Sequence, residues 1–385
     1  ESFEFLAGNF DIADIGLFDP YVKSAKDLNP NLLVVGYRSA IDMHRPAEVW
    51  EDNYNAYDKN YKDWPTVNAN DDWFLHDEAG DRLRENSYNA YVMNPASAGW
   101  RAHNAEYMAQ SLLGLPQYDG VFVDNCFYTM PVGFADSSHW HVTIKNEQCV
   151  LGDDRATLIT QHDVLITPYC SEKPKVRLSE NELDQDYYGN GGSCSGKTIT
   201  LGVALPPEVQ PGATLYVTYD ALDDSFKMKQ EDIDSWPEGM ILMLKEIKTK
   251  IKDKLLFINT QDPAIFVDYA DGLMDEHFVH ADWETEDYFR PLSDWKLHVD
   301  NISVATSKGK IFLAQCGTKR SPGATDEAVK KVMMYCLASY LLGKGDISSF
   351  YFLDGTNGTY NHVDYYPEWD IDLGLPLTTY DLLAE

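Results

Sequence analysis

Two segments of the sequence end an apolar run in a carboxylate. Residues 118–125, YDGVFVDN, place Asp124 and Asn125 directly after a run of Val and Phe. Residues 270–277, ADGLMDEH, repeat the Asp-Gly start and end in Glu276. If two strands bring these carboxyl groups together, they can hydrolyse a glycosidic bond, with one group as nucleophile or base and the other as acid. We therefore expect Asp124 and Glu276 to be catalytic.

Each of these roles has an alternative in the sequence itself. Asp275 and Asp268 compete with Glu276 for the second role, because both lie close to it in the chain. A carboxylate at the end of a strand can also cap the following helix or pair with an arginine such as Arg38. The sequence alone leaves these alternatives open.

Further polar residues follow the other apolar runs or lie in a long aromatic loop. Arg38 could hold a substrate hydroxyl or the nucleophile, or form a buried ion pair. Trp73, His76 and Asp77 in the loop could stack on a sugar and bind its hydroxyls, or could simply pack within the loop. Gln315 and Asp354, after the last strands, could line the pocket or form turns. The candidate substrate-binding residues are Arg38, Trp73, His76, Asp77, Asn125, Gln315 and Asp354.

The sequence gives little support for a metal site. His139 and His141 share a strand face but lack a third ligand, and Asp184 and Asp186 do not have EF-hand spacing. A metal-dependent hydrolase or deacetylase would need a set such as H-x-x-E-H, which is absent from the sequence. We expect an enzyme that uses no metal and no cofactor.

The elements that must position these residues alternate between buried strands and helices. This alternation predicts a parallel sheet covered by helices. Most strands end in a polar residue and no G-x-G-x-x-G follows the early ones, which favours a (β/α)8 TIM barrel over a doubly wound sheet. Only seven strands are found, so we expect the first barrel strand to be missing from this chain. The predicted strands are residues 3–6, 32–37, 120–124, 255–259, 272–276, 310–315 and 349–353.

The middle of the chain has a different pattern. Short β-type runs separated by Gly, Pro, Asn and Asp predict an all-β, sandwich-like subdomain at residues 136–226, inserted into the barrel. Residues 1–135, with a long substrate loop at 38–96, and residues 227–385 form the two parts of the barrel. Cys170 and Cys194 flank a Gly-rich loop of the insertion, and we expect a disulfide between them.

Composition limits the class of partner. The chain has 385 residues and a net charge of −31, which would repel a phosphate backbone, so we expect no nucleic acid partner. No apolar run approaches the roughly 20 residues of a membrane span. The 24 Tyr, 16 Phe and 9 Trp are suited to covering sugar faces. An acidic chain that opens with Glu1 leads us to expect a processed, secreted protein; the oligomeric state stays open.

Three motifs resemble a known family. WFLHD at residues 73–77, VMNPASAGWRAHN at 92–104 and YDGVFVDN at 118–125 are similar to hypothetical glycosyl hydrolase-like family 15. The resemblance covers the barrel segments and not the inserted sheet. More distantly, the strand endings resemble glycoside hydrolase family 114 and the α-galactosidase-like barrels, which implies that Asp124 matches the nucleophile on strand 4 and Glu276 the acid on strand 6.

The leading hypothesis is a secreted glycoside hydrolase, of retaining type, that cleaves a poly- or oligosaccharide. The alternative is a non-catalytic carbohydrate-binding or structural extracellular protein on the same scaffold, because fold alone does not decide function. The two hypotheses differ in whether Asp124 and Glu276 face one open cleft without an Arg or Lys that neutralises both.

Overall fold

The chain forms two compact units. The computed structural model describes residues 3–16, 22–43, 62–84, 90–113, 115, 117–130, 141–164, 173–181, 183–189, 191–222, 228–354, 365–371 and 373–374. Unit 1 comprises Glu1–Ala40, Pro95–Tyr128 and Pro237–Glu385, and unit 2 comprises Ile41–Asn94 and Thr129–Trp236. Contacts group Ile41–Asn94 with Thr129–Trp236, and the predicted domain boundaries stay a prediction.

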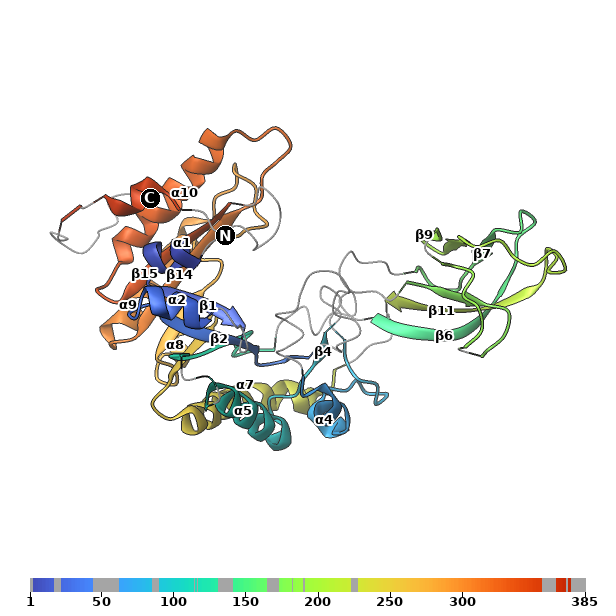
Figure 1. The fold of residues 1–385 in the computed structure, drawn as a ribbon, viewed down its shortest axis with the longest axis horizontal. Helices are drawn as coiled ribbons and strands as arrows, with labels where there is room; N and C mark the ends of the chain where they lie inside the picture. Colours follow the sequence, from blue (N-terminus) through green and yellow to red (C-terminus); the bar gives the residue numbers. More distant parts are fainter. Residues whose placement is uncertain are drawn as a thin grey trace. The chain divides into compact units, whose positions relative to one another are not determined.

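Unit 1 is built on a seven-stranded parallel sheet whose spatial order follows the chain order (Figure 1). This order and the alternation with helices are compatible with a partial TIM-like barrel. The missing eighth strand stays a prediction. The strands are β1 (Ile12–Gly16), β2 (Leu33–Ser39), β5 (Gly120–Asp124), β12 (Leu255–Asn259), β13 (Gly272–Asp275), β14 (Ile311–Thr318) and β15 (Ser348–Asp354).

Six of the seven predicted strands are confirmed within a few residues, and one is wrong. Residues 3–6 belong to the helix α1 (Phe3–Asn9), and the first strand of the sheet is β1. The sequence of β1, Ile-Ala-Asp-Ile-Gly, carries Asp14 at its centre, and this charge interrupts the apolar run on which strand prediction depends.

Helices alternate with the strands of unit 1, and α9 and α10 pack on β14 and on each other (Figure 1). The Thr325 side chain caps the start of α10 by accepting a hydrogen bond from the N–H of Ala328, and the helix ends at Gly343. The helix α7 contains Pro237. These helices are α2 (Val22–Leu28), α5 (Ala98–Leu113), α7 (Gln230–Ile251), α8 (Pro263–Phe266), α9 (Leu292–Ser307) and α10 (Asp326–Gly343), followed by the 3-10 helix η4 (Pro367–Asp370).

The inner face of the sheet has its own apolar cluster, formed around Val35, Phe122 and Phe257. Two inward positions are glycines. A Cβ on Gly120 would lie 2.2 Å from the Leu255 carbonyl oxygen, and one on Gly272 would lie 2.3 Å from the Phe257 ring. The glycines of the two Asp-Gly motifs therefore allow β12 to pack closely against β5 and β13, below the carboxylates. The partly buried members of the cluster are Ile12, Tyr37, Leu255, Met274, Ile311 and Leu313.

Unit 2 contains the predicted all-β segment. It has two antiparallel three-stranded sheets, in the orders β6-β11-β8 and β7-β10-β9, and a common cluster of buried residues that includes Val176, Ile199 and Leu215. The strands are β6 (His141–Val150), β7 (Thr157–Ile159), β8 (Lys175–Arg177), β9 (Ser193–Ser195), β10 (Thr198–Thr200) and β11 (Thr214–Leu222). The rest of the unit includes β3 (Asp42–Met43), α4 (Trp64–Asn68), the 3-10 helix η1 (Asp71–Trp73) and β4 (Tyr91–Val92).

The predicted disulfide between Cys170 and Cys194 stays a prediction. Cys194 packs against the core of unit 2 and carries a free thiol there. Cys170 lies outside the described residues.

The inward glycines give a test of the sheet. Gly120→Ala should lower the free energy of unfolding by roughly 2 kcal/mol or more, because the new methyl group meets the backbone of β12. Gly8→Ala is the matched control, since a Cβ at Gly8 in α1 meets nothing within 4 Å. Urea unfolding followed by circular dichroism measures both variants. Equal stabilities of the two variants would contradict the packing described here.

Candidate active site

Asp124 and Glu276 are joined by a single amide group. The Nδ2 atom of Asn259 donates hydrogen bonds to Oδ1 of Asp124, at 2.9 Å, and to Oε2 of Glu276, at 2.7 Å. Oxygens that bond to one nitrogen lie less than about 6 Å apart. Carboxyl groups of retaining glycosidases are about 5–5.5 Å apart and those of inverting enzymes about 6.5–9.5 Å. The nearest oxygens of this pair therefore fit the shorter of the two separations.

Asp124 accepts two further hydrogen bonds. The Tyr37 hydroxyl donates to Oδ2 at 2.7 Å, and the backbone N–H of Asn125 donates to Oδ1 at 2.8 Å. The Tyr37 ring is itself held by stacking on Phe122, with 6.3 Å between the ring centroids. Among the residues that the structure describes, no ion pair joins Asp124 to a lysine or arginine. The carboxylate is thus held by neutral donors.

Asn125 takes part through its backbone. Its φ of 59° lies in the left-handed region, which Asn tolerates better than most residues. This conformation accompanies the hydrogen bond from its N–H to the side chain of Asp124, the residue just before it. Asn125 therefore lies next to Asp124, and the predicted action of its side chain on the substrate stays a prediction.

A third carboxylate, which the sequence analysis missed, belongs to this group. Asp14 lies two residues after the inward-facing Ile12 of β1, and alternation along a strand places both on the same face. The Asp14 side chain remains accessible to solvent. Its pKa is raised well above the ordinary value, first by the loss of hydration among surrounding protein atoms and then by the charges of Asp124 and Glu276. An acid at the centre of an otherwise apolar strand was the available signal.

Arg38 lies on the opposite face of the sheet from this site, and its contact with a substrate stays a prediction. Alternation along β2 turns Tyr37 inward and Arg38 outward into the helix layer. Arg38 is buried there, its Nε donates to Oδ1 of Asn104 at 3.0 Å, and its guanidinium lies 4.5 Å from the centre of the Tyr107 ring.

The two residues predicted after the last strands have different environments. Asp354 forms a bidentate pair with Arg320, at 2.9 and 2.8 Å, which supports the turn role rather than the pocket role. Gln315 lies two residues after the inward-facing Leu313 of β14, and its side chain is half-buried. Gln315 therefore remains a candidate for substrate binding.

The acids that competed with Glu276 point elsewhere. Asp275 is buried, with its Oδ2 atom 2.5 Å from Nδ1 of His298 on the helix α9. Asp268 is paired with Lys308 at 2.9 Å. Of these three acids, Glu276 is the one that shares a hydrogen-bond donor with Asp124.

The predicted loop residues Trp73, His76 and Asp77 belong to unit 2. Asp77 is buried and accepts the N–H of Asp81 at 2.8 Å, so it stabilises a turn. Nε2 of His76 lies 3.0 Å from Oδ2 of Asp71, and Trp73 is half-buried. A substrate role for these residues stays a prediction.

In the part of the chain that the structure describes, no group of three or more His, Cys, Asp or Glu side chains could hold a metal ion. The Asp186 carboxylate instead accepts the N–H groups of Val176 and Tyr188. His139 lies outside the described residues.

Within the described ranges, no helix is long and apolar enough to cross a membrane.

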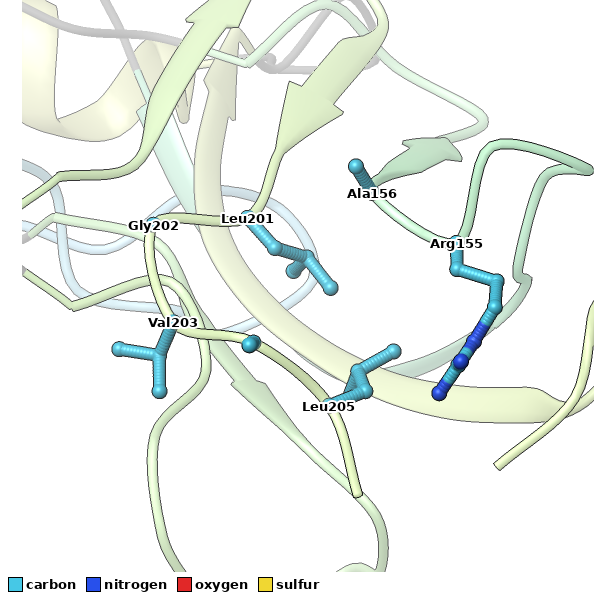
Figure 2. A pocket seen from close by; sticks show the side chains of 7 residues that line it. Arg155, Ala156, Leu201, Gly202, Val203 and Leu205 are labelled. Atoms are coloured by element: carbon cyan, nitrogen blue, oxygen red, sulfur yellow. The ribbon is translucent and has the colours of Figure 1, made fainter. Parts of the chain in front are cut away.

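Unit 2 has a separate hollow of about 380 Å³. Figure 2 shows Arg155, Leu201 and Leu205 around it. Arg155 donates to the Pro206 carbonyl at 2.8 Å. None of the predicted site residues lines this hollow.

Comparison with known proteins identifies related sequences and folds. The model of hypothetical glycosyl hydrolase family 15 matches residues 26–147 and 217–384, which is more than half of the chain. One similar solved structure is the glycoside hydrolase domain of a PelA variant from Pseudomonas aeruginosa, with 12% sequence identity, a TM-score of 0.45, and coverage of 92% of this chain and 90% of that chain. A search of curated proteins finds no match.

The repulsion around Asp14 gives a test by pH. Because the pKa of Asp14 is higher in the folded than in the unfolded protein, protonation of Asp14 stabilises the fold. This contribution is complete below the pKa of the unfolded state, near pH 4, and is lost as the pH rises through the pKa of the folded state. Asp14→Asn stays neutral, so its melting temperature should exceed that of the wild type by a few degrees at about pH 8 and match it at about pH 3. Differential scanning calorimetry across this range measures the difference.

Asp253→Asn is the matched control for Asp14→Asn. Asp253 is exposed between α7 and β12, at the other end of the sheet. A difference between Asp14→Asn and the wild type that stays constant with pH would contradict a raised pKa of Asp14 in the folded protein.

Proposed function

The chain belongs to hypothetical glycosyl hydrolase family 15, and from this premise we propose that it is a retaining glycoside hydrolase acting on an oligo- or polysaccharide. Asp124 is the nucleophile and Glu276 the acid/base. The observation that carries the proposal is the Asn259 amide, which bonds both carboxylates and keeps the two bonded oxygens closer together than the carboxyl groups of inverting enzymes.

In the first step, protonated Glu276 gives its proton to the glycosidic oxygen while a carboxylate oxygen of Asp124 attacks the anomeric carbon. The bond from that carbon to the leaving oxygen breaks, and a glycosyl ester of Asp124 forms. Tyr37 and Asn259 donate to Asp124 and hold it in position. The second sugar leaves as an alcohol.

In the second step, Glu276 acts as base. It removes a proton from water, the water oxygen attacks the anomeric carbon, and the ester bond to Asp124 breaks. Two displacements at one carbon return the original anomeric configuration. Asp124 is then ionised and Glu276 protonated, as at the start.

The charge of the chain favours certain substrates. A net charge of −31 and three acids at the site disfavour a polyanionic glycan, so a neutral or cationic glycan is the proposed substrate class. Secretion of the protein is part of the same proposal.

Two substitutions test the assignment. Asp124→Asn should lower kcat on a cleaved glycan by at least about 1000-fold, because no ester can form. Glu276→Gln should lose activity on natural glycosides but retain much of it on activated aryl glycosides, whose leaving groups need little protonation. The measurement is the release of reducing ends from a glycan panel, and of aryl alcohol from the activated substrates.

Glu327→Gln, on the exposed first turn of α10, is the matched control and should have wild-type rates. Retained glycan cleavage by Asp124→Asn would exclude it as nucleophile. If the wild type binds glycans but cleaves none, the carbohydrate-binding alternative is the correct one.

A further inference from the structure

The loop after β13 presents an exposed tryptophan close to Glu276. Trp283 is 60% exposed. Its indole contacts the His277 imidazole, with 4.0 Å between ring centroids, and Nε2 of His277 lies 3.9 Å from Oε2 of Glu276. Only one side chain therefore separates the Trp283 ring from the proposed acid/base.

The loop that carries Trp283 is well anchored. The N–H of Ala281 donates to the Glu284 carboxylate at 2.7 Å, and the N–H of Glu284 donates to the Ala281 carbonyl at 3.1 Å. The N–H groups of Gly317 and Lys319, at the end of β14, donate to the carbonyls of His280 and Glu284. Trp283 thus lies at the tip of a turn fixed on both sides.

Beneath this turn, His280 is fully buried. Its Nδ1 lies 2.7 Å from the Gly317 carbonyl oxygen, and its Nε2 lies 3.1 Å from that of Tyr288. These contacts tie the loop to β14 and to its own later residues. An aromatic ring held in one place loses little conformational freedom when a ligand binds.

The partner of Trp283 is an uncharged ring. Burial lowers the pKa of His277, more than the nearby acids Asp282 and Asp275 raise it. The imidazole is therefore neutral at neutral pH. The two rings meet edge to face, at an interplanar angle of 63°, and the exposed surface beside Glu276 is that of the Trp283 indole. Such an uncharged aromatic surface can cover the C–H face of a sugar.

We propose that Trp283 is the stacking platform for the sugar on the leaving-group side of the scissile bond. The argument rests on the proposed function, in which Glu276 protonates the leaving oxygen, so the sugar nearest Glu276 and Trp283 is the one that departs. The ligand is an uncharged pyranose ring, and the enzyme is thereby directed to bonds between two sugars rather than to glycosides of small alcohols.

The test compares two leaving groups. The substrates are the shortest oligosaccharide that the wild type cleaves and the glycosyl fluoride of the same donor sugar, whose leaving group has no ring. Trp283→Ala should lower kcat/KM on the oligosaccharide by about 10- to 100-fold and leave fluoride hydrolysis within about twofold of the wild type. Trp283→Phe should recover most of the oligosaccharide activity.

Tyr288→Ala is the matched control, because Tyr288 is an exposed aromatic of the same loop and should not affect either substrate. Equal losses on both substrates, or no loss on the oligosaccharide, would overturn the role of Trp283 while leaving Asp124 and Glu276 in place. Cleavage that survives Asp124→Asn would instead remove the proposed function. If the wild type hydrolyses neither substrate, both proposals fail.

Discussion

One amide group holds two carboxylates together at the end of the sheet. Asn259 lies on β12, between the strands that carry Asp124 and lead to Glu276, and its two N–H bonds are divided between them. A lysine at this place would bring the acids together through a positive charge. The amide does so without adding charge, which leaves one acid able to attack and the other able to transfer a proton. The pairing of β5, β12 and β13 in the sheet of unit 1 holds the three side chains in this arrangement.

The two faces of the sheet differ in how their acidic side chains are paired. On the outer face, Arg320 pairs with Asp354 and His298 with Asp275. On the inner face, the acids are held by an amide, a phenol and a backbone N–H. Loss of hydration, followed by the charges of Asp124 and Glu276, raises the pKa of Asp14, so its ionised form costs stability. Such local cost is expected where a site is arranged for chemistry rather than for stability.

Much of the sheet, and the closeness of Asp124 and Glu276, could be predicted from the sequence. An apolar run that ends in an acid indicates both a buried strand and a carboxylate at the end of that strand. Asp14 was missed because an inward-facing acid breaks the apolar run of its own strand. The apolar run before Arg38 does not reveal that its side chain faces the helix layer, where it bonds to Asn104. The grouping of residues 41–94 with unit 2 depends on contacts between distant segments, which no local pattern reports.

The central claim is that Asp124 forms a covalent bond to the sugar. The most direct measurement is mass spectrometry of peptides from the enzyme after incubation with a 2-deoxy-2-fluoro glycosyl fluoride of the donor sugar, because the fluorine slows breakdown of the intermediate. The account predicts one added glycosyl group on the peptide that contains Asp124, and none in Asp124→Asn. A glycosyl group on Glu276 or Asp14, or turnover of the substrate with no adduct and inverted configuration, would contradict it.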